Sequence, residues 1–193
     1  MRKIDQKPAP LFSKIAWGMG GLPEMLANNA ILVLVYQIYN IELGLNPMWI
    51  GVALMISRIL DAVTDPLMGN LTDNTRTKWG RRRPWILLGA VIMSVFFAMI
   101  WLIPPGLGQM GLFAWFATMT VLFYIGFTIF IIPFGALGLE LELDYDLRTK
   151  LQVFRLFPSF AGGFVLPWLY KMTLSDCFAH ETLATAVNGV RYV

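Results

Sequence analysis

The chain has 193 residues, of which 57% are hydrophobic and only 14% are charged, and its formal net charge is +3 at pH 7. Soluble domains carry about 25% charged residues, so this composition argues against a soluble globular protein, and the mean hydropathy of +0.62 favours a membrane protein. The small net charge gives no reason to expect a nucleic-acid partner.

Five apolar segments follow one another, each close to the roughly 20 residues that a helix needs to cross a bilayer. They occupy residues 11–41, 47–71, 84–103, 110–139 and 151–170. The first segment is too long for a signal peptide and lacks a small-residue cleavage site. Pro47 stands at a favourable first helical position, and Pro104 and Pro105 end the third segment.

Helices are the expected form of these segments, because an open sheet cannot pair its backbone groups within lipid. The alternation typical of an outer-membrane barrel is not found. The sequence therefore predicts an all-α integral membrane bundle of about five helices. We expect a cytoplasmic N-terminal segment (1–10), a five-helix domain (11–171) and a tail (172–193) that is too polar to span.

Lysine and arginine gather at alternate ends of the predicted helices. They precede or begin the first helix, follow the second and follow the fourth, at Arg2, Lys3, Lys7, Lys14, Arg76, Lys78, Arg81, Arg82, Arg83, Arg148 and Lys150. The opposite loops, IELGLNP and PPGLGQM, contain neither residue. Since positive charge marks the cytoplasmic side, we expect a plasma (inner) membrane protein with its N-terminus in the cytoplasm.

The second segment contains three charged residues, Arg58, Asp61 and Asp65, inside an apolar run. Their spacing of three and four residues places them on one helical face. A charge at the bilayer centre costs at least about 2.5–3.5 kcal/mol, so these side chains must pair or face a polar cavity. Two carboxylates one turn apart repel each other, which favours a proton or a cation between them.

Two interpretations of this face remain open. Asp61, Asp65 and the hydroxyl of Thr64 supply oxygen ligands that suit a monovalent cation or a proton. Alternatively, Arg58 neutralises Asp61 and the pair braces the bundle.

The stretch RILDAVTDPLMGNLTDNTRTKWGRRRPWIL resembles the helix II and loop 2–3 signature of the glycoside–pentoside–hexuronide:cation symporters, the melibiose-permease-like branch of the major facilitator superfamily. The later stretch IPFGALGLELELDYDLRTKLQVFR is similar to the end of that family's helix IV and the loop after it. The family has twelve helices in two halves of six. The resemblance, which covers essentially the whole chain, implies a truncated N-terminal half whose sixth helix is missing.

The resemblance also implies residue roles in a cation site and a sugar site. Asp61 and Asp65 correspond to the family's cation-binding carboxylates, with Thr64 as a polar neighbour. Thr128 corresponds to a hydroxyl near the same cation, and Arg155 to an arginine that lines the sugar side of the cavity.

Two acids of the family are absent from their expected positions. The helix IV acid aligns with Ile131, and the helix I sugar-binding acid aligns with Met25, one residue after Glu24. Glu24, Asn28 and Asn29 are intramembrane polar groups that either bind a sugar or form hydrogen bonds between helices.

The loop after the second segment resembles the superfamily's gating motif, in which a glycine and an aspartate precede basic residues. Gly69 is expected to allow close helix packing, while Asp73 and the basic residues form a charge network. Breaking that network would shift alternating access. The gating residues are then Gly69, Asp73, Arg76, Arg81 and Arg82. The same basic residues also serve the positive-inside rule.

The resemblance implies a cation-coupled secondary transporter rather than an enzyme, working by alternating access around sites near the membrane midplane. We expect a sugar or glycoside as substrate, Na⁺, Li⁺ or H⁺ as coupling ion, and no cofactor. The chain needs the missing C-terminal helices or a partner chain, or else it is an inert truncated product.

An integral-membrane enzyme that holds Mg²⁺ between Asp61 and Asp65 for lipid-headgroup transfer is the alternative. It requires a second aspartate cluster, which this sequence lacks. Cys177 and His180 have no further histidine or cysteine to complete a metal site. The acidic run ELELDYD is expected to be a solvated helix end.

Overall fold

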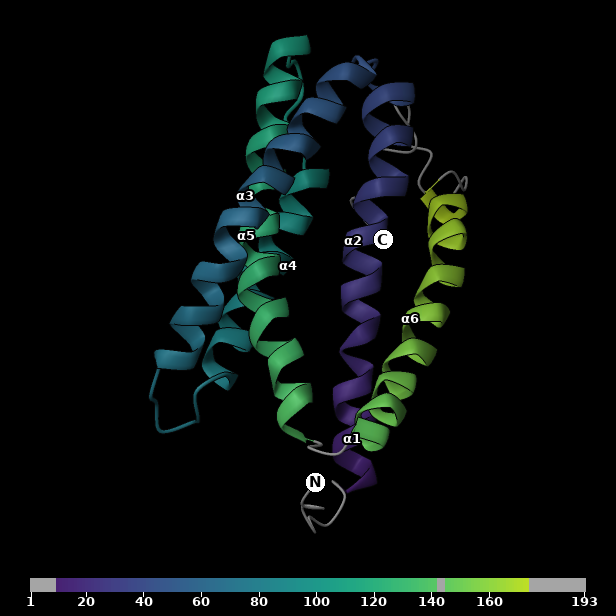
Figure 1. Cartoon of the computed structure of the whole chain (residues 1–193). Coiled ribbons are helices and arrows are strands. Elements are labelled where there is room, and N and C mark those ends of the chain that lie inside the picture. Colours follow the sequence, from purple (N-terminus) through teal and green to yellow (C-terminus); the bar gives the residue numbers. More distant parts are fainter. Residues whose placement is uncertain (1–9, 142–144, 174–193) are drawn as a thin grey trace.

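The computed structural model describes residues 10–141 and 145–173, and every regular element within them is helical (Figure 1). The elements are α1 (Leu11–Met19), α2 (Gly21–Val35), the π-helix η1 (Tyr36–Glu42), α3 (Pro47–Asn74), α4 (Arg83–Trp101), α5 (Gln109–Leu141) and α6 (Tyr145–Thr173). The all-α prediction is confirmed. The first predicted helix is interrupted by a turn at Gly20 and ends as a π-helix.

Four continuous helical stretches of the described chain are long and apolar enough to cross a membrane. These are Leu11–Glu42, α3, α4 and α5. α6 has 29 residues and corresponds to the fifth predicted helix, but it is not apolar enough to be counted with these four membrane-span candidates. It begins six residues before the predicted start, so it takes in the charged residues Arg148 and Lys150.

Local sequence explains where α3 begins. The side chain of Asn46 accepts a hydrogen bond from the backbone N–H of Met48 at 2.9 Å, and Pro47 stands in the first turn. This is a standard N-cap followed by proline. Pro66 lies inside the helix without ending it, and its missing N–H leaves the carbonyl of Ala62 without its helical donor.

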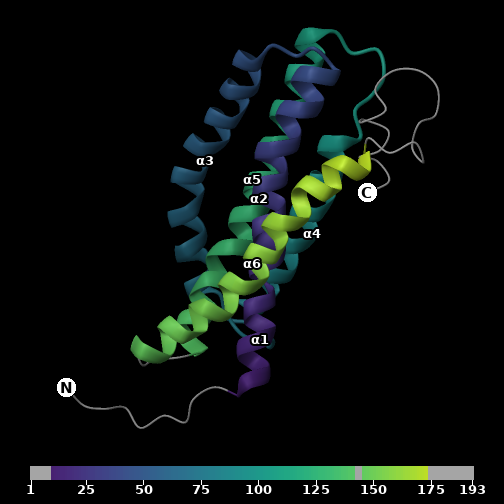
Figure 2. The same ribbon diagram turned by 90° about the vertical axis from the view of Figure 1, so that its right-hand side faces the viewer.

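The helices form two packed groups. α5 packs against α3 and α4, and α6 packs against α1 and α2, while α5 and α6 barely touch. Figure 1 shows the first group on the left, and Figure 2 shows α6 running obliquely across α1 and α2. A buried apolar cluster drawn from α2, η1, α3, α4 and α5 joins the groups. Within it, the ring of Tyr39 of η1 packs at a tilt against that of Phe116, with centroids 4.7 Å apart, and the Tyr39 hydroxyl donates to the carbonyl of Ile100 at 2.5 Å.

Two glycines allow α4 and α5 to pack closely against each other. A Cβ added at Gly89 would lie 2.4 Å from the backbone nitrogen of Phe130, and one at Gly126 would lie 2.7 Å from that of Met93. Small residues allow such close contact between membrane helices. By contrast, a Cβ at Gly69 would meet no atom within 4 Å. The close packing expected at Gly69 is therefore not found against any helix that the structure describes.

Candidate functional site

α3 and α5 bring together three of the four residues predicted to bind a cation. Thr128 of α5 is buried and donates its hydroxyl to Oδ1 of Asp65 at 3.1 Å. Asp61, one turn earlier on α3, interacts electrostatically with Asp65 and lies within reach of the same hydroxyl. The hydroxyl of Thr64 donates to the backbone carbonyl of Asp61 at 3.4 Å rather than to either carboxylate, and its role as a cation ligand stays a prediction.

Arg58 connects this carboxylate pair to the neighbouring helices. Its Nη1 lies 3.3 Å from Oδ2 of Asp61, and its Nη2 donates to the side-chain oxygen of Asn28 at 3.4 Å and to the hydroxyl of Tyr124 at 3.3 Å. The guanidinium also lies 4.7 Å from the centre of the Tyr124 ring. The bracing pair considered from sequence is present, but Arg58 reaches only one oxygen of Asp61.

The two carboxylates thus retain oxygens that can act as ligands. The hydrogen bond from Thr128 uses one oxygen of Asp65, and Arg58 contacts one oxygen of Asp61. Carboxylate and hydroxyl oxygens are the ligands that hard cations prefer. The arrangement is chemically able to accept a small monovalent cation or a proton between the two carboxylates.

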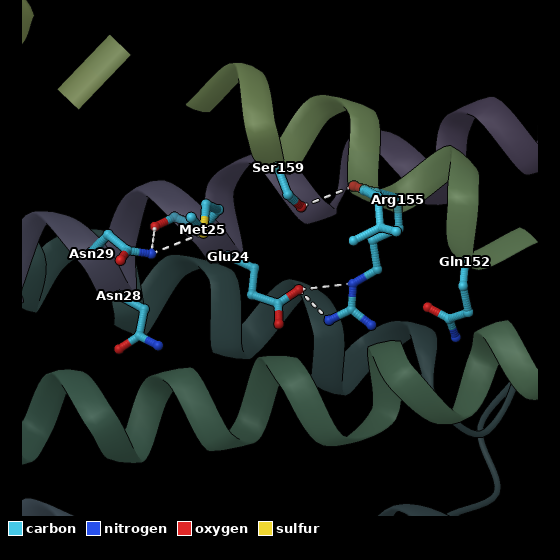
Figure 3. Close-up of a pocket in the computed structure, with 8 residues that line it drawn as sticks. Glu24, Met25, Asn28, Asn29, Gln152, Arg155 and Ser159 are labelled. Atoms are coloured by element: carbon cyan, nitrogen blue, oxygen red, sulfur yellow. Dashed lines mark hydrogen bonds and ion pairs between the residues drawn. The ribbon is translucent and has the colours of Figure 1, made fainter. Parts of the chain in front are cut away.

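A second site is a polar cavity of about 280 Å³ between α2 and α6 (Figure 3). It is lined by Glu24, Met25, Asn28, Asn29, Gln152, Arg155, Leu156 and Ser159. All three residues predicted to bind substrate, Glu24, Asn28 and Arg155, therefore meet here. The two positions where the family carries acids are occupied by Met25, which lines the cavity, and by Ile131, which packs against buried aromatic rings.

An ion pair crosses this cavity from α6 to α2. Both Nε and Nη2 of Arg155 donate to Oε2 of Glu24, the Nε bond at 3.0 Å, as Figure 3 shows. The guanidinium lies 5.6 Å from the ring of Trp17 and 5.7 Å from that of Phe134. Cation–π contacts and the carboxylate together hold the charge in place.

Asn28 belongs to both sites. It lines the cavity, and its side-chain oxygen accepts hydrogen bonds from Arg58 and from the hydroxyl of Tyr124, at 3.4 and 3.3 Å. A continuous line of polar contacts therefore runs from Asp61 through Arg58 to the cavity wall. The sequence showed the charges on α3 and the polar residues on α2, but Tyr124 carried no signal that marked it as the connecting residue.

The predicted charge network lies at the end of the bundle that also holds the start of α1 (Figure 1). We call residues 75–83, the connection after α3 together with the first residue of α4, the basic loop. Arg82 lies 3.1 Å from Asp73 of α3 and 3.3 Å from Glu140 of α5, and Arg81 lies 2.9 Å from Glu140. Arg76 is exposed and stands outside this network.

Glu140 was missed by the sequence interpretation, which treated ELELDYD as a solvated helix end. It links the basic loop to α5 through two arginines. The acidic run beside an intramembrane helix was the available signal, but its partner could not be chosen without the fold. Cys177, His180 and most of the predicted tail lie outside the described residues, and the described part contains no group of three or more metal-ligating His, Cys, Asp or Glu side chains.

Comparison with known proteins gives a consistent family match. A family model described as MFS/sugar transport protein matches residues 16–184. An uncharacterised symporter of Synechocystis is 35% identical over 164 residues, which cover 82% of this chain and 30% of the relative. The inner membrane symporter YicJ of Escherichia coli is 31% identical over 91% of this chain and 38% of its own length.

A vertebrate protein also matches. The sodium-dependent lysophosphatidylcholine symporter 1-A of Danio rerio is 31% identical over 76% of this chain and 27% of its own length. The chain thus spans about a third of the length of the curated relatives it matches.

Proposed function

This chain belongs to the MFS/sugar transport protein family, and we propose that it supplies the N-terminal helices of a cation-coupled symporter that moves a neutral sugar or glycoside. It is an integral membrane protein of a transporter family, and its relatives are symporters rather than enzymes. The magnesium-dependent lipid-headgroup enzyme considered from sequence is set aside on this ground.

The cation site is assigned to Asp61, Asp65 and Thr128. The two carboxylates repel each other when both are ionised, and a proton, Na⁺ or Li⁺ between them would remove that repulsion. Thr128 supports the assignment because it is buried and already donates to Asp65 across the α3–α5 interface. Cation binding would thus tighten the packing of α3 on α5.

The substrate site is assigned to the cavity that Glu24, Asn28 and Arg155 line. The ion pair between Glu24 and Arg155 leaves the cavity with balanced charge, while the amides of Asn28 and Gln152 offer neutral donors and acceptors. This lining suits a neutral, hydroxyl-rich solute better than an anion or a long acyl chain.

The observation that carries the proposal is the line of contacts from the carboxylates to the cavity. Arg58 pairs with Asp61 and donates to Asn28 of the cavity wall. A cation that neutralises Asp61 would release Arg58 and alter the hydrogen bonds of Asn28. This is a physical route by which cation occupancy would change substrate affinity.

Alternating access is assigned to the charge network of Asp73, Arg81, Arg82 and Glu140, which ties the basic loop to α5. Breaking it would favour the conformation in which this end is open. Because the chain spans about a third of its relatives, the transporter also requires further helices, from an extended chain or from a partner chain.

Uptake by cells that express a full-length transporter built on this sequence tests the proposal. We expect uptake of at least one neutral sugar or glycoside that rises with an inward gradient of Na⁺, Li⁺ or H⁺. Uptake of lysophosphatidylcholine without any sugar would reject the substrate assignment. Sugar uptake that is indifferent to all three ions would reject cation coupling.

A further inference from the structure

The basic loop carries more positive charge than its ion-pair partners among the described residues neutralise. It contains five basic residues, Arg76, Lys78, Arg81, Arg82 and Arg83, and no acidic residue. Arg81 and Arg82 are paired with Glu140 and Asp73. Arg76, Lys78 and Arg83 are exposed, and no ion pair within residues 10–141 and 145–173 includes them.

The start of α4 adds to this positive field. The helix has no side-chain cap and no acidic residue in its first turn, while Arg81, Arg82 and Arg83 surround its N-terminus. A helix N-terminus carries a partial positive charge, so cations there are unfavourable unless an anion compensates them. Within the part of the chain that the structure describes, Glu140 and Asp73 compensate Arg81 and Arg82, and no acidic side chain pairs with Arg83 at this helix start.

Trp79 stands at the tip of the loop with 69% of its surface exposed. A tight turn presents it: Gly80 adopts a φ of +98°, its N–H donates to the carbonyl of Thr77 at 3.1 Å, and the Thr77 hydroxyl donates to the carbonyl of Gly80 at 2.5 Å. Only glycine adopts this backbone conformation readily. The fold thus holds a large aromatic ring outward beside Lys78.

The position of the loop decides between a lipid and a soluble partner. α3 ends at Asn74 and α4 begins at Arg83, and both are membrane-span candidates, so the loop lies at the level of the lipid headgroups. Tryptophan concentrates at this interface because its ring is amphipathic. Lysine and arginine next to a membrane helix attract anionic lipids. An exposed tryptophan between free cations matches a headgroup layer rather than an acidic peptide.

We propose that the basic loop docks on anionic phospholipid headgroups, with Arg76, Lys78 and Arg83 binding the phosphates and Trp79 anchored in the interface. This inference does not depend on the transported substrate or the coupling ion. Each basic residue near an anionic surface strengthens binding up to about fivefold. We therefore expect removal of the three free cations to abolish most of the preference for anionic lipid.

Quenching of Trp79 fluorescence in reconstituted vesicles provides the test. The chain is placed in phosphatidylcholine vesicles that contain a minor fraction of phosphatidylglycerol, with the bromine quencher on one lipid or the other. The Trp79 signal is the difference between the wild type and Trp79→Phe. We expect stronger quenching by brominated phosphatidylglycerol than by brominated phosphatidylcholine, and a loss of this preference at high salt.

The variants separate the loop from general charge. Lys78→Gln lowers the preference up to about fivefold, and the triple variant R76Q/K78Q/R83Q removes it. Lys150→Gln, an equal charge change at an exposed residue outside the loop, leaves it intact. An unchanged preference in the triple variant, or an equal loss in Lys150→Gln, would overturn the proposal. So would loop-dependent binding of polyglutamate without any phosphatidylglycerol preference.

Discussion

At the scale of single residues, Arg58 decides how the charges on α3 are shared. Its three polar contacts, to Asp61, Asn28 and the Tyr124 hydroxyl, have lengths of 3.3 to 3.4 Å. These are long for charge-assisted hydrogen bonds, which are typically about 2.7–2.9 Å. Arg58 is thus divided between partners rather than committed to Asp61. Because Arg58 is shared in this way, a cation that binds at Asp61 can displace it. Coupling between cation binding and substrate affinity requires such a displacement.

Thr128 and Thr120 offer a matched pair for testing the cation site. Both are buried threonines of α5, but Thr128 donates to Asp65, while the Thr120 hydroxyl finds no hydrogen-bond partner among the described residues. Thr128→Val removes one of the three oxygen-bearing side chains assigned to the cation, so it should weaken cation affinity about tenfold, or about 1.4 kcal/mol. Thr120→Val should leave it unchanged. Equal cation affinities in the two variants, measured by titration, would remove Thr128 from the site.

The Glu24–Arg155 pair should show strong coupling in stability. Both side chains are largely buried, at 26% and 21% exposure, so removing one partner leaves a charge without compensation. We expect Glu24→Gln and Arg155→Gln each to lower the unfolding temperature. The double variant should lose less stability than the sum of the two single losses, with an interaction energy of about 1–3 kcal/mol between the two side chains. Strictly additive losses in thermal unfolding would show that the pair is not formed in the membrane.

At the scale of helices, the sequence predicted those helix ends that local residues such as proline determine. Pro47 correctly marked the start of α3, and the prolines at 104 and 105 follow closely on the end of α4. The π-helix at Tyr36–Glu42 and the early start of α6 were not predicted, because no local signal in those segments specifies them. Close helix packing was expected at Gly69, yet the glycines at which α4 and α5 pack closely are Gly89 and Gly126. Which glycine faces a neighbouring helix depends on packing, which one sequence does not reveal.

A pair of glycine substitutions tests the α4–α5 crossing. Gly89→Ala would place a Cβ 2.4 Å from the backbone of Phe130, and such overpacking costs about 1–3 kcal/mol. Gly51→Ala in α3 meets nothing within 4 Å, so its improved helix propensity should make it neutral or stabilising by up to about 1 kcal/mol. Thermal unfolding in detergent compares the two. If Gly89→Ala is as stable as Gly51→Ala, the helices do not cross this closely.

At the scale of the whole molecule, the two proposed sites lie on different helix groups. The carboxylates and Thr128 belong to α3 and α5, whereas the cavity lies between α2 and α6. The sequence and its resemblance predicted Asp61, Asp65 and Thr128 for the first site and Glu24, Asn28 and Arg155 for the second, but they gave no signal for Gln152 or Ser159. The partnership of Glu24 with Arg155, 131 residues apart, and that of Arg81 with Glu140 depend on the fold. No periodicity in the chain encodes such distant pairs.

The topology expected from loop charge remains a prediction. The N-terminus and the basic loop should lie in the cytoplasm, and the loop that contains Asn46 should lie outside. Single cysteines at Asn46 and at Thr77, in a Cys177→Ser background, can be labelled with a membrane-impermeant thiol reagent. We expect labelling from outside at position 46 only. Labelling from outside at position 77 but not at 46 would reverse the assignment.

The central claim is that Asp61 and Asp65 bind the ion that controls substrate affinity. The measurement is substrate affinity of a full-length transporter built on this sequence, with and without Na⁺ or Li⁺ and across pH, in the wild type, Asp61→Asn and Asp65→Asn. The wild type should bind substrate more tightly with at least one of these cations. Asp65→Asn should retain weak substrate binding that no cation enhances, and Asp61→Asn should add instability because Arg58 loses its carboxylate partner. The same cation dependence in both variants as in the wild type would show that the two carboxylates only brace the helices.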